Sequence, residues 1–454
     1  MIKRRTFLAL AGAAAGHAAL ERSGLAVAAT SRPGAKADAD LRIQPISVEL
    51  APGVTVKTVG YNGQAPGPVL RFREGAAVTI DVHNETAVPE LVHWHGLAID
   101  PINDGAMEEG SPMIAPGARQ RYSYRPTPAG TRWYHTHTTA NADLGRSMYT
   151  GQFGFLYIEP KSEPGGYDQE IFMAIHHWVP SMMKMGPPMN AFDVGYKYAS
   201  FNDKLASAAE PIRVREGERV LFRFLNASAT ENVSIALPGH RFTVIAMDGN
   251  VVPQPRSVET LALGTAERID AIVEMTTPGV WLLGSTDAAE RAKGLGRTIE
   301  YAGRKGEAVW SDPDEVAWDY LRFANESKAP EPDVRVPMVF APVPAGADGF
   351  QRWTVNGKVY PDGEPMKVQK GKRYRLGFLN SSAEVHPLHL HRHSFELVSV
   401  AGRKCSGLMK DVVNIPAYSS MEVDFVANNP GDTLFHCHQQ LHMDYGFMQL
   451  IKYV

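Results

Sequence analysis

Short runs of alternating apolar and polar residues recur along this chain, with glycine, proline and charged residues between them. Examples are residues 77–82 and 219–224, in which alternate positions are apolar. A period of two is typical of β-strands that bury one face. The 41 glycines and 32 prolines supply turns between the runs. The pattern therefore predicts an all-β fold built from many short strands.

The alternating runs belong to a unit that occurs three times. In each copy a charged residue and a glycine precede the strand, and an asparagine turn follows it. The glycine and asparagine positions are Gly75 and Asn84, Gly217 and Asn226, and Gly371 and Asn380. A second repeated position lies N-terminal to each copy, at Asn62, Asn202 and Asn356. Successive glycines are 142 and 154 residues apart, so each copy is as long as a domain and too long for a solenoid repeat.

The repeat predicts three β-sandwich domains, at about residues 43–162, 168–325 and 335–454. The boundaries fall in stretches rich in proline, glycine and charge. A length of 454 residues also favours several domains over one. The alternative is that strand-turn-strand segments resemble one another by chance.

Residues 1–28 are predicted to be a targeting segment. Residues 4–8 read RRTFL, which resembles a twin-arginine signal, and residues 26–28 offer a cleavage site. An ordinary secretory signal or a membrane anchor is the alternative, although the apolar stretch falls short of the roughly 20 residues of a spanning helix. We therefore expect export to the periplasm and a mature chain without a membrane span.

Charge and cysteine content narrow the function classes. The formal net charge is −3 and charged residues are 21% of the chain, without the basic stripe of a nucleic-acid-binding protein. The two cysteines, Cys405 and Cys437, cannot form a disulfide framework. Because Cys437 lies between two histidines, we expect Cys405 to be a buried free thiol.

Ten of the 16 histidines fall in four short clusters. Residues i and i+2 of a strand point to the same face, so each cluster offers a pair of converging imidazoles. The pairs are His93 and His95, His135 and His137, His389 and His391, and His436 and His438. Copper, zinc, iron and nickel all accept imidazole ligands, so the count alone leaves the metal open. One such pair is usually structural, but four pairs with a cysteine inside one of them are not expected by chance.

Cys437 narrows the choice of metal. It lies between His436 and His438, so its sulfur should point to the opposite face of the strand. There it can meet His442, farther along the chain, and His386. A trigonal set of two histidines and a cysteine is the signature of a blue-copper electron-transfer site. One strand would then join two metal sites.

These clusters resemble the four copper motifs of the multicopper oxidase family, which includes laccases and bacterial cuprous oxidases. The forms HxHG, HxH, HxxHxH and HCHxxxH occur complete and in order. The resemblance implies three cupredoxin-like Greek-key β-sandwich domains, with a copper-free middle domain and four copper ions. It implies a type 1 copper on His386, Cys437 and His442, a type 2 copper on His93 and His389, one type 3 copper on His95, His135 and His438, and another on His137, His391 and His436.

The family resemblance also implies a reaction. A reducing substrate loses one electron at a time near the type 1 copper, and dioxygen is reduced to water at the trinuclear cluster. The partners are dioxygen and a small-molecule or metal-ion donor, and we expect a monomer. Asp104 matches the family's acidic residue near the cluster, where it would relay protons. Its alternative role is that of a turn residue, since Asp-Gly pairs are common in turns.

Two positions depart from the bacterial cuprous oxidases. Phe447 occupies the family's axial position, as in many laccases, and a bulge would be needed to bring the neighbouring Met448 to the metal. Met443 stands where several bacterial members carry a glutamate, and Asp444 is a weak substitute for it. The absence of an axial ligand should raise the type 1 potential.

Residues 182–189 read MMKMGPPM and form a methionine-rich loop. Thioethers bind Cu(I), so the loop could dock cuprous ions; the alternative is an adaptable apolar loop that packs between domains. The leading hypothesis is a laccase-like oxidase of phenols or aromatic amines, and the second is a cuprous-ion oxidase. A copper-free structural relative is the third, although the ligand set is complete. We expect structural roles for residues 409–413 and for the histidines outside the clusters.

Overall fold

The computed structural model describes residues 36–162, 165–187, 190–314 and 318–454, which form one compact unit. The predicted targeting segment, residues 1–28, lies outside the described residues. In the ranges just given, no helix combines the length and the hydrophobicity that a membrane span requires.

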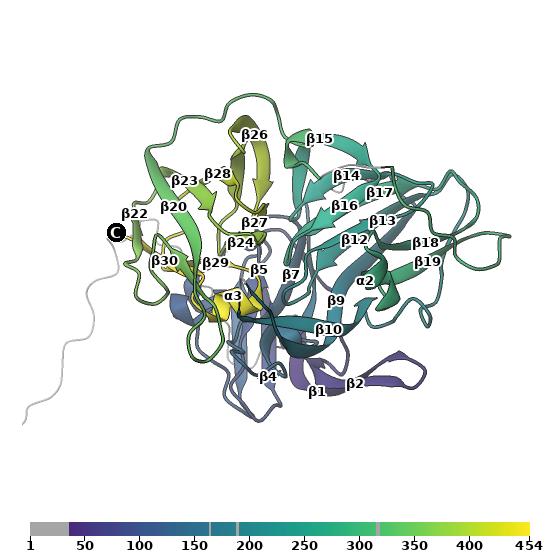
Figure 1. Ribbon diagram of the computed structural model, residues 1–454, viewed down its shortest axis with the longest axis horizontal. Coiled ribbons are helices and arrows are strands. Elements are labelled where there is room, and N and C mark those ends of the chain that lie inside the picture. Colours follow the sequence, from purple (N-terminus) through teal and green to yellow (C-terminus); the bar gives the residue numbers. More distant parts are fainter. Residues whose placement is uncertain (1–35, 163–164, 188–189, 315–317) are drawn as a thin grey trace, which may run out of the picture. The chain divides into compact units, whose positions relative to one another are not determined.

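The first part of the chain forms two four-stranded sheets (Figure 1), with the orders β2-β1-β4-β6 and β3-β8-β7-β5. The strands are β1 (Ala39–Ala51), β2 (Val54–Tyr61), β3 (Leu70–Arg73), β4 (Val78–Asn84), β5 (Val92–His95), β6 (Arg119–Tyr124), β7 (Gly130–Thr136) and β8 (Phe153–Glu159). Between them lie the short helix α1 (Pro101–Asp104) and the 3₁₀ turns η1 (Met107–Glu109) and η2 (Ser147–Tyr149).

The middle part forms a six-stranded sheet, β10-β9-β12-β17-β14-β15, and a five-stranded sheet, β11-β19-β18-β13-β16. The strands are β9 (Gln169–Lys184), β10 (Phe192–Phe201), β11 (Ile212–Val214), β12 (Arg219–Asn226), β13 (Val233–Ala236), β14 (Phe242–Met247), β15 (Asn250–Val258), β16 (Thr260–Leu263), β17 (Arg268–Glu274), β18 (Val280–Ser285) and β19 (Gly296–Tyr301). The helix α2 (Ala288–Ala292) precedes β19, and η3 (Tyr320–Arg322) follows it.

The last part forms the sheets β21-β20-β23-β28-β25-β26 and β22-β30-β29-β24-β27. The strands are β20 (Val334–Val343), β21 (Arg352–Val355), β22 (Met366–Val368), β23 (Arg373–Asn380), β24 (His386–Leu390), β25 (Phe395–Val400), β26 (Arg403–Lys410), β27 (Val412–Ile415), β28 (Ser420–Val426), β29 (Thr433–Cys437) and β30 (Met448–Tyr453). The short helix α3 (Gln440–Asp444) lies between β29 and β30.

The same strand order recurs in the three parts. The sheets of the middle and last parts match strand for strand, and the first part lacks only the equivalents of β14, β15 and β16. In each part the first strand pairs in parallel with the strand that ends at the repeated asparagine. These pairs are β1 and β4, β9 and β12, and β20 and β23. The internal repeat of the sequence is therefore a repeat of topology, and the all-β prediction is confirmed.

The asparagines of the repeat make the same contacts in each copy. Each side-chain amide donates to one backbone carbonyl in the turn that follows the strand and to a second carbonyl 30 to 37 residues away, and its oxygen accepts a backbone N–H two residues later. These residues are Asn84, Asn226 and Asn380. An asparagine that closes its own turn explains why this residue type returns at each strand end.

One expectation fails for β12, where seven of the eight residues are buried instead of one face alone. Val220, Phe222 and Phe224 belong to the core of the middle part. On the other face, the Arg223 guanidinium lies 4.1 Å from the ring centroid of Tyr157 in β8. The face expected to meet solvent is covered by the first part of the chain. The residues of β12 therefore do not alternate between buried and exposed, although the sequence alternates.

Candidate metal centres

The four histidine clusters lie on strands β5, β7, β24 and β29, close to the strand ends. His93 and His95 both belong to β5, as the period of two predicts. In the other clusters the second histidine of the pair lies just beyond the last strand residue; these are His137, His391 and His438. All these strand ends are buried. In these three pairs only the first histidine belongs to the strand, yet the two imidazoles of each pair still point into the same cluster.

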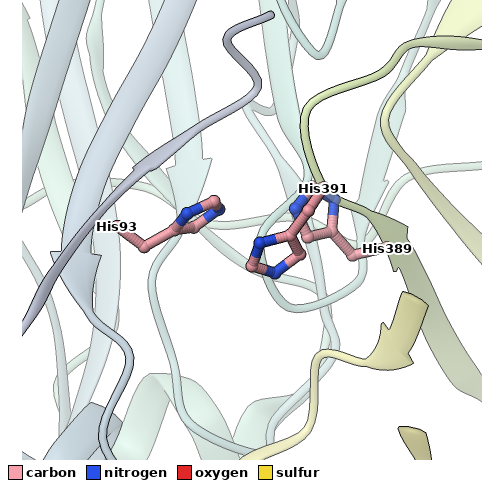
Figure 2. A group of neighbouring side chains, drawn as sticks. All are labelled: His93, His389 and His391. Atoms are coloured by element: carbon pink, nitrogen blue, oxygen red, sulfur yellow. The ribbon is translucent and has the colours of Figure 1, made fainter. Parts of the chain in front are cut away.

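The eight imidazoles of the pairs form one cluster. The ring of His93 stacks on that of His391 with centroids 4.0 Å apart, and His95 stacks on His389 at 3.8 Å. Figure 2 shows His93 on one side facing His389 and His391 on the other. The remaining four rings close the cluster through centroid distances of 5.1 Å for His135 and His438 and 5.3 Å for His137 and His436. The first and last parts of the chain therefore each contribute four imidazoles.

Hydrogen bonds hold one ring nitrogen of most of these histidines and leave the other free. Backbone carbonyls accept from the Nδ1 atoms of His93, His135, His389 and His436 at 2.7–2.8 Å. Among the described residues, no hydrogen-bond partner faces the buried Nε2 atoms of His93, His135, His137 and His389. The Nε2 atoms of His391 and His436 face each other at 3.1 Å. Buried polar atoms without partners are costly, and metal ions at the centre of the cluster would satisfy them.

The electrostatics of the cluster favour metal binding. Burial, reinforced by neighbouring histidines, lowers the pKa of seven of these imidazoles well below the ordinary value. They are His95, His135, His137, His389, His391, His436 and His438. Neutral imidazole is the form that binds metals. The cluster is therefore in its metal-binding protonation state near neutral pH.

A second donor set surrounds Cys437. The Nδ1 atoms of His386 and His442 lie 3.8 and 3.6 Å from its Sγ and 3.2 Å from each other. The outer nitrogens are held by Ser382, whose Oγ is 2.8 Å from His386, and by Glu384, whose carboxylate is 3.1 Å from His442. Burial raises the pKa of the Cys437 thiol, so a bound cation is needed to keep a thiolate there.

The aromatic wall of this second set includes Phe447, which is fully buried. Its ring centroid lies 5.0 Å from that of His386 and 5.5 Å from that of Trp353. Met448 instead packs with Leu434 and with Met443, in a separate apolar cluster. A phenyl ring cannot coordinate a metal, and the thioether of Met448 is directed to other neighbours.

Asp104 ends α1 and contacts two histidines of the cluster. Its Oδ2 accepts from Nδ1 of His391 at 2.9 Å and lies 3.1 Å from Nδ1 of His93. Gly105 follows with a φ of 91°, so the Asp-Gly pair also closes the helix, as a turn residue would. Burial, with the Asp104 carboxylate nearby, raises the pKa of Glu109 well above its ordinary value. Glu109 therefore favours its protonated form beside the cluster.

Asp411 contacts the cluster as well, whereas the sequence pattern predicts only a structural role for its segment, residues 409–413. Its Oδ1 lies 3.1 Å from Nε2 of His95, which is 316 residues away in the sequence. The available signal was a charged Lys410-Asp411 pair inside an apolar run, since charged residues are rarely buried without partners. That signal indicates a buried ion pair, but it does not identify His95 as a residue that Asp411 contacts.

The remaining candidates have other contacts. His177 lies between Ser228 and Glu290, and His240 meets Tyr301. Asp444 accepts from two backbone N–H groups of residues 140–141 and from Gln440, and burial raises the pKa of Asp444 to about 6. These contacts make Asp444 an anchor between α3 and that loop. Cys405 and Cys437 are both free and buried, as expected.

Glu90 provides a test of pH dependence near the cluster. Burial raises the pKa of Glu90 from 4.5 to about 7. The folded state therefore binds the proton more tightly than the unfolded state, and stability falls as the pH rises from about 4.5 to 7. We expect Glu90→Gln to increase the free energy of unfolding at pH 8 by up to about 3 kcal/mol and to have little effect at pH 4.5.

Urea unfolding at both pH values measures this effect. Glu49→Gln, at an exposed position, is the control and should give no pH-dependent gain. An equal effect of Glu90→Gln at the two pH values would show that burial does not shift the titration of this carboxyl group.

Comparison with known proteins identifies the family. Profiles of the multicopper oxidase family match residues 42–163, 179–300 and 333–453. Multicopper oxidase MmcO from Mycobacterium tuberculosis is 30% identical over 98% of this chain and 92% of its own length. Laccase-2 from Trametes versicolor is 25% identical over 85% of this chain and 84% of its own length. The crystal structure of a multi-copper oxidase from Pseudomonas thermotolerans covers 92% of this chain and 100% of its own, with a TM-score of 0.72 and 25% identity.

These matches agree with the sequence-based expectation of fold and metal. The three matched ranges correspond to the three topological repeats, which are cupredoxin-like β-sandwiches. Copper is the metal that the family uses. The chain belongs to the multicopper oxidase family and is a copper-dependent oxidoreductase that uses dioxygen.

Proposed function

We propose that this protein is an exported, periplasmic, laccase-like oxidase that couples one-electron oxidation of a phenolic or aromatic donor to four-electron reduction of dioxygen to water. The observation that carries the proposal is that two donor sets meet on one segment, His436-Cys437-His438. The proposed ligands are His386, Cys437 and His442 for type 1 copper, His93 and His389 for type 2, His95, His135 and His438 for one type 3 ion, and His137, His391 and His436 for the other.

The donor atoms suit copper. The Cys437 set offers a thiolate and two imidazole nitrogens, the trigonal combination typical of blue-copper sites, and the cluster offers imidazole nitrogens with no competing partner. Copper held by these residues would supply the electron transfer, with one-electron chemistry at the Cys437 set and four-electron reduction of dioxygen at the histidine cluster.

The protein provides the path between the sites and the entry for the donor. Cys437 is covalently joined to His436 and His438, so a continuous covalent path connects the two sets. At the outer end, Glu384 holds Nε2 of His442, and their side chains are 28% and 7% exposed. A phenol that docks at this edge finds a ring for electron transfer and a carboxylate that can accept its proton.

Protons for the formation of water come from the acidic pair. Asp104 touches His93 and His391, and Glu109 lies 3.4 Å from Nδ1 of His391. Because burial favours the protonated form of Glu109, the pair can release a proton toward the centre of the cluster. This arrangement supports the relay role of Asp104 in addition to its place in the helix cap.

Phe447 favours an organic donor, because a type 1 site without an axial ligand has a high potential. We expect Phe447→Met to lower that potential by at least about 60 mV, a tenfold shift toward the oxidised ion, and to slow the oxidation of phenols. Redox titration of the blue absorption measures the change. Met448→Leu is the control, because Met448 packs elsewhere, and a drop of equal size in that variant would contradict the assignment of Phe447.

Oxidation of Cu(I) is the second candidate, and the methionine-rich loop of residues 182–189, at the end of β9 and before β10, supports it. Met183 and Met185, at the β9–β10 end, are 43% and 36% exposed, which suits soft donors that meet a metal ion from solution. Met182 packs against an apolar cluster of buried residues that Tyr445, next to α3, also contacts. Met189 lies outside the described residues.

Oxygen uptake with a phenol and, separately, with Cu(I) distinguishes the two candidates. The laccase-like function predicts faster uptake with the phenol and no effect of the double variant Met183→Leu/Met185→Leu. Uptake mainly with Cu(I), reduced by the double variant but not by the exposed control Met107→Leu, would replace the laccase-like proposal by the second candidate. Absence of bound copper in the loaded protein would instead indicate a copper-free structural relative.

A further inference from the structure

A buried cluster of charged side chains connects the histidine cluster to the middle domain. Its centre is Asp411, between β26 and β27. Arg268 of β17 donates to both carboxylate oxygens, from Nη1 to Oδ1 and from Nη2 to Oδ2, each at 2.6 Å. Arg132 of β7 adds a contact of 3.2 Å to Oδ2. All three side chains have zero exposure, so each charge depends on the others for stabilisation.

The same aspartate contacts two proposed copper ligands. Its Oδ1 meets Nε2 of His95 at 3.1 Å, and its backbone oxygen accepts from Nδ1 of His389 at 2.7 Å. The two rings stack with an interplanar angle of 15°. One residue therefore orients a ligand of the type 3 set and a ligand of the type 2 set.

The contact with His95 also decides which of its nitrogens is available. A carboxylate paired with two guanidinium groups accepts hydrogen bonds, so Nε2 of His95 carries the proton. Its Nδ1 is buried and has no partner among the described residues. His93, His135 and His389 show the opposite arrangement, with Nδ1 bonded and Nε2 free. Asp411 thus fixes the tautomer in which His95 presents Nδ1 to the cluster.

The middle domain holds the backbone on which Asp411 lies. Oδ2 of Asp248, in the β14–β15 turn, accepts from the backbone N–H groups of Asp411 and Val412 at 3.3 and 3.1 Å. Its Oδ1 accepts from the backbone N–H of Arg268 at 3.0 Å. Lys410 adds an ion pair of 2.9 Å to Asp248. Although the middle domain supplies none of the proposed ligands, it fixes the residue that orients two of them.

Gly96, the glycine of the HxHG motif, shows how tightly this contact is packed. A Cβ atom at this position would lie 2.6 Å from Oδ2 of Asp411 and 2.9 Å from Nη2 of Arg268. Its φ of 84° is also in the left-handed region. The motif glycine therefore makes room for the ion pair beside His95.

We propose that Asp411, clamped by Arg268, is a positioning residue of the trinuclear site and makes copper loading of that site depend on the middle domain. The inference rests on the proposed function, because it takes His95 and His389 as copper ligands. Outer partners of metal-binding histidines typically change metal affinity by about 10- to 100-fold when they are replaced.

The test is anaerobic copper titration of the full-length, metal-free protein and its Asp411→Asn variant. Elemental analysis gives copper bound per chain, electron paramagnetic resonance gives the type 2 signal, and the blue absorption reports the Cys437 site. We expect copper affinity at the trinuclear site to fall by about 10- to 100-fold, with loss of the type 2 signal and an unchanged blue absorption.

Asp424→Asn is the matched control. Asp424 also receives a two-pronged contact from one arginine, Arg375, at 2.6 and 2.9 Å, and a further one from Arg373 at 2.7 Å. None of these contacts involves a histidine. We expect this variant to lose stability as Asp411→Asn does but to load the trinuclear site normally.

The outcomes separate the proposals. Normal trinuclear loading of Asp411→Asn, with a stability loss equal to that of Asp424→Asn, would overturn the positioning role. If Asp411→Asn does not fold, Arg268→Lys carries the test: reduced loading supports the role, and wild-type loading overturns it. A wild-type protein that never shows a type 2 signal would contradict the proposed function itself.

Discussion

Replacing Cys437 with serine is expected to abolish the blue absorption and to reduce donor oxidation to background. Cys437 is the sulfur donor of the set that it forms with His386 and His442, and it is also the covalent link to His436 and His438. Serine keeps the size of the side chain but supplies a hard, weakly acidic oxygen in place of a soft thiolate. Electron entry and electron passage are therefore lost together.

The histidine cluster should survive this substitution, because none of its rings uses the sulfur. Copper analysis of Cys437→Ser should show three ions per chain, with the type 2 signal retained. Cys405→Ser is the control, since Cys405 donates a hydrogen bond to the Leu397 carbonyl and is not one of the proposed copper ligands. Retention of donor oxidation by Cys437→Ser would mean that electrons enter by another route.

Asp104→Asn is expected to give the second-largest loss, about 10²- to 10⁴-fold in turnover. The amide keeps the shape of the side chain and leaves the backbone contact with His93 in place. It cannot exchange a proton with Glu109 or accept from His391 in the same way. Proton supply to dioxygen should fail, whereas copper binding should be largely kept.

Two measurements identify the affected step. Under air, steady-state oxygen uptake by Asp104→Asn should fall while the anaerobic rate at which a donor bleaches the blue absorption stays normal. Asp143→Asn, in the exposed turn of residues 141–145, is the control. Loss of copper from Asp104→Asn, with slower bleaching, would assign Asp104 a structural role alone.

The pattern of the chain was sufficient to predict the class of fold and the location of the candidate ligands. Asn84, Asn226 and Asn380 mark equivalent turns because a side chain that closes its own turn leaves a local signal. The histidine pairs could be placed on strand faces because a spacing of two residues is also a local signal. Three pairs extend past a strand end, and His442 lies on α3, which the period of two did not predict.

Long-range contacts account for what the sequence could not provide. The Asp411 carboxylate meets His95 and Arg268, at sequence separations of 316 and 143 residues, and no local pattern encodes such a contact. The burial of both faces of β12 has the same origin, since another part of the chain covers it. Glu109 was missed because its role depends on the nearness of Asp104 in space, not on a motif.

The stoichiometry of oxygen consumption tests the central claim most directly. Copper-loaded protein should be supplied with a limiting one-electron phenolic donor while dioxygen and hydrogen peroxide are followed together. The proposed function predicts one dioxygen consumed for every four electrons, without peroxide. One dioxygen for every two electrons, with peroxide as the product, would contradict a trinuclear site assembled from the eight histidines.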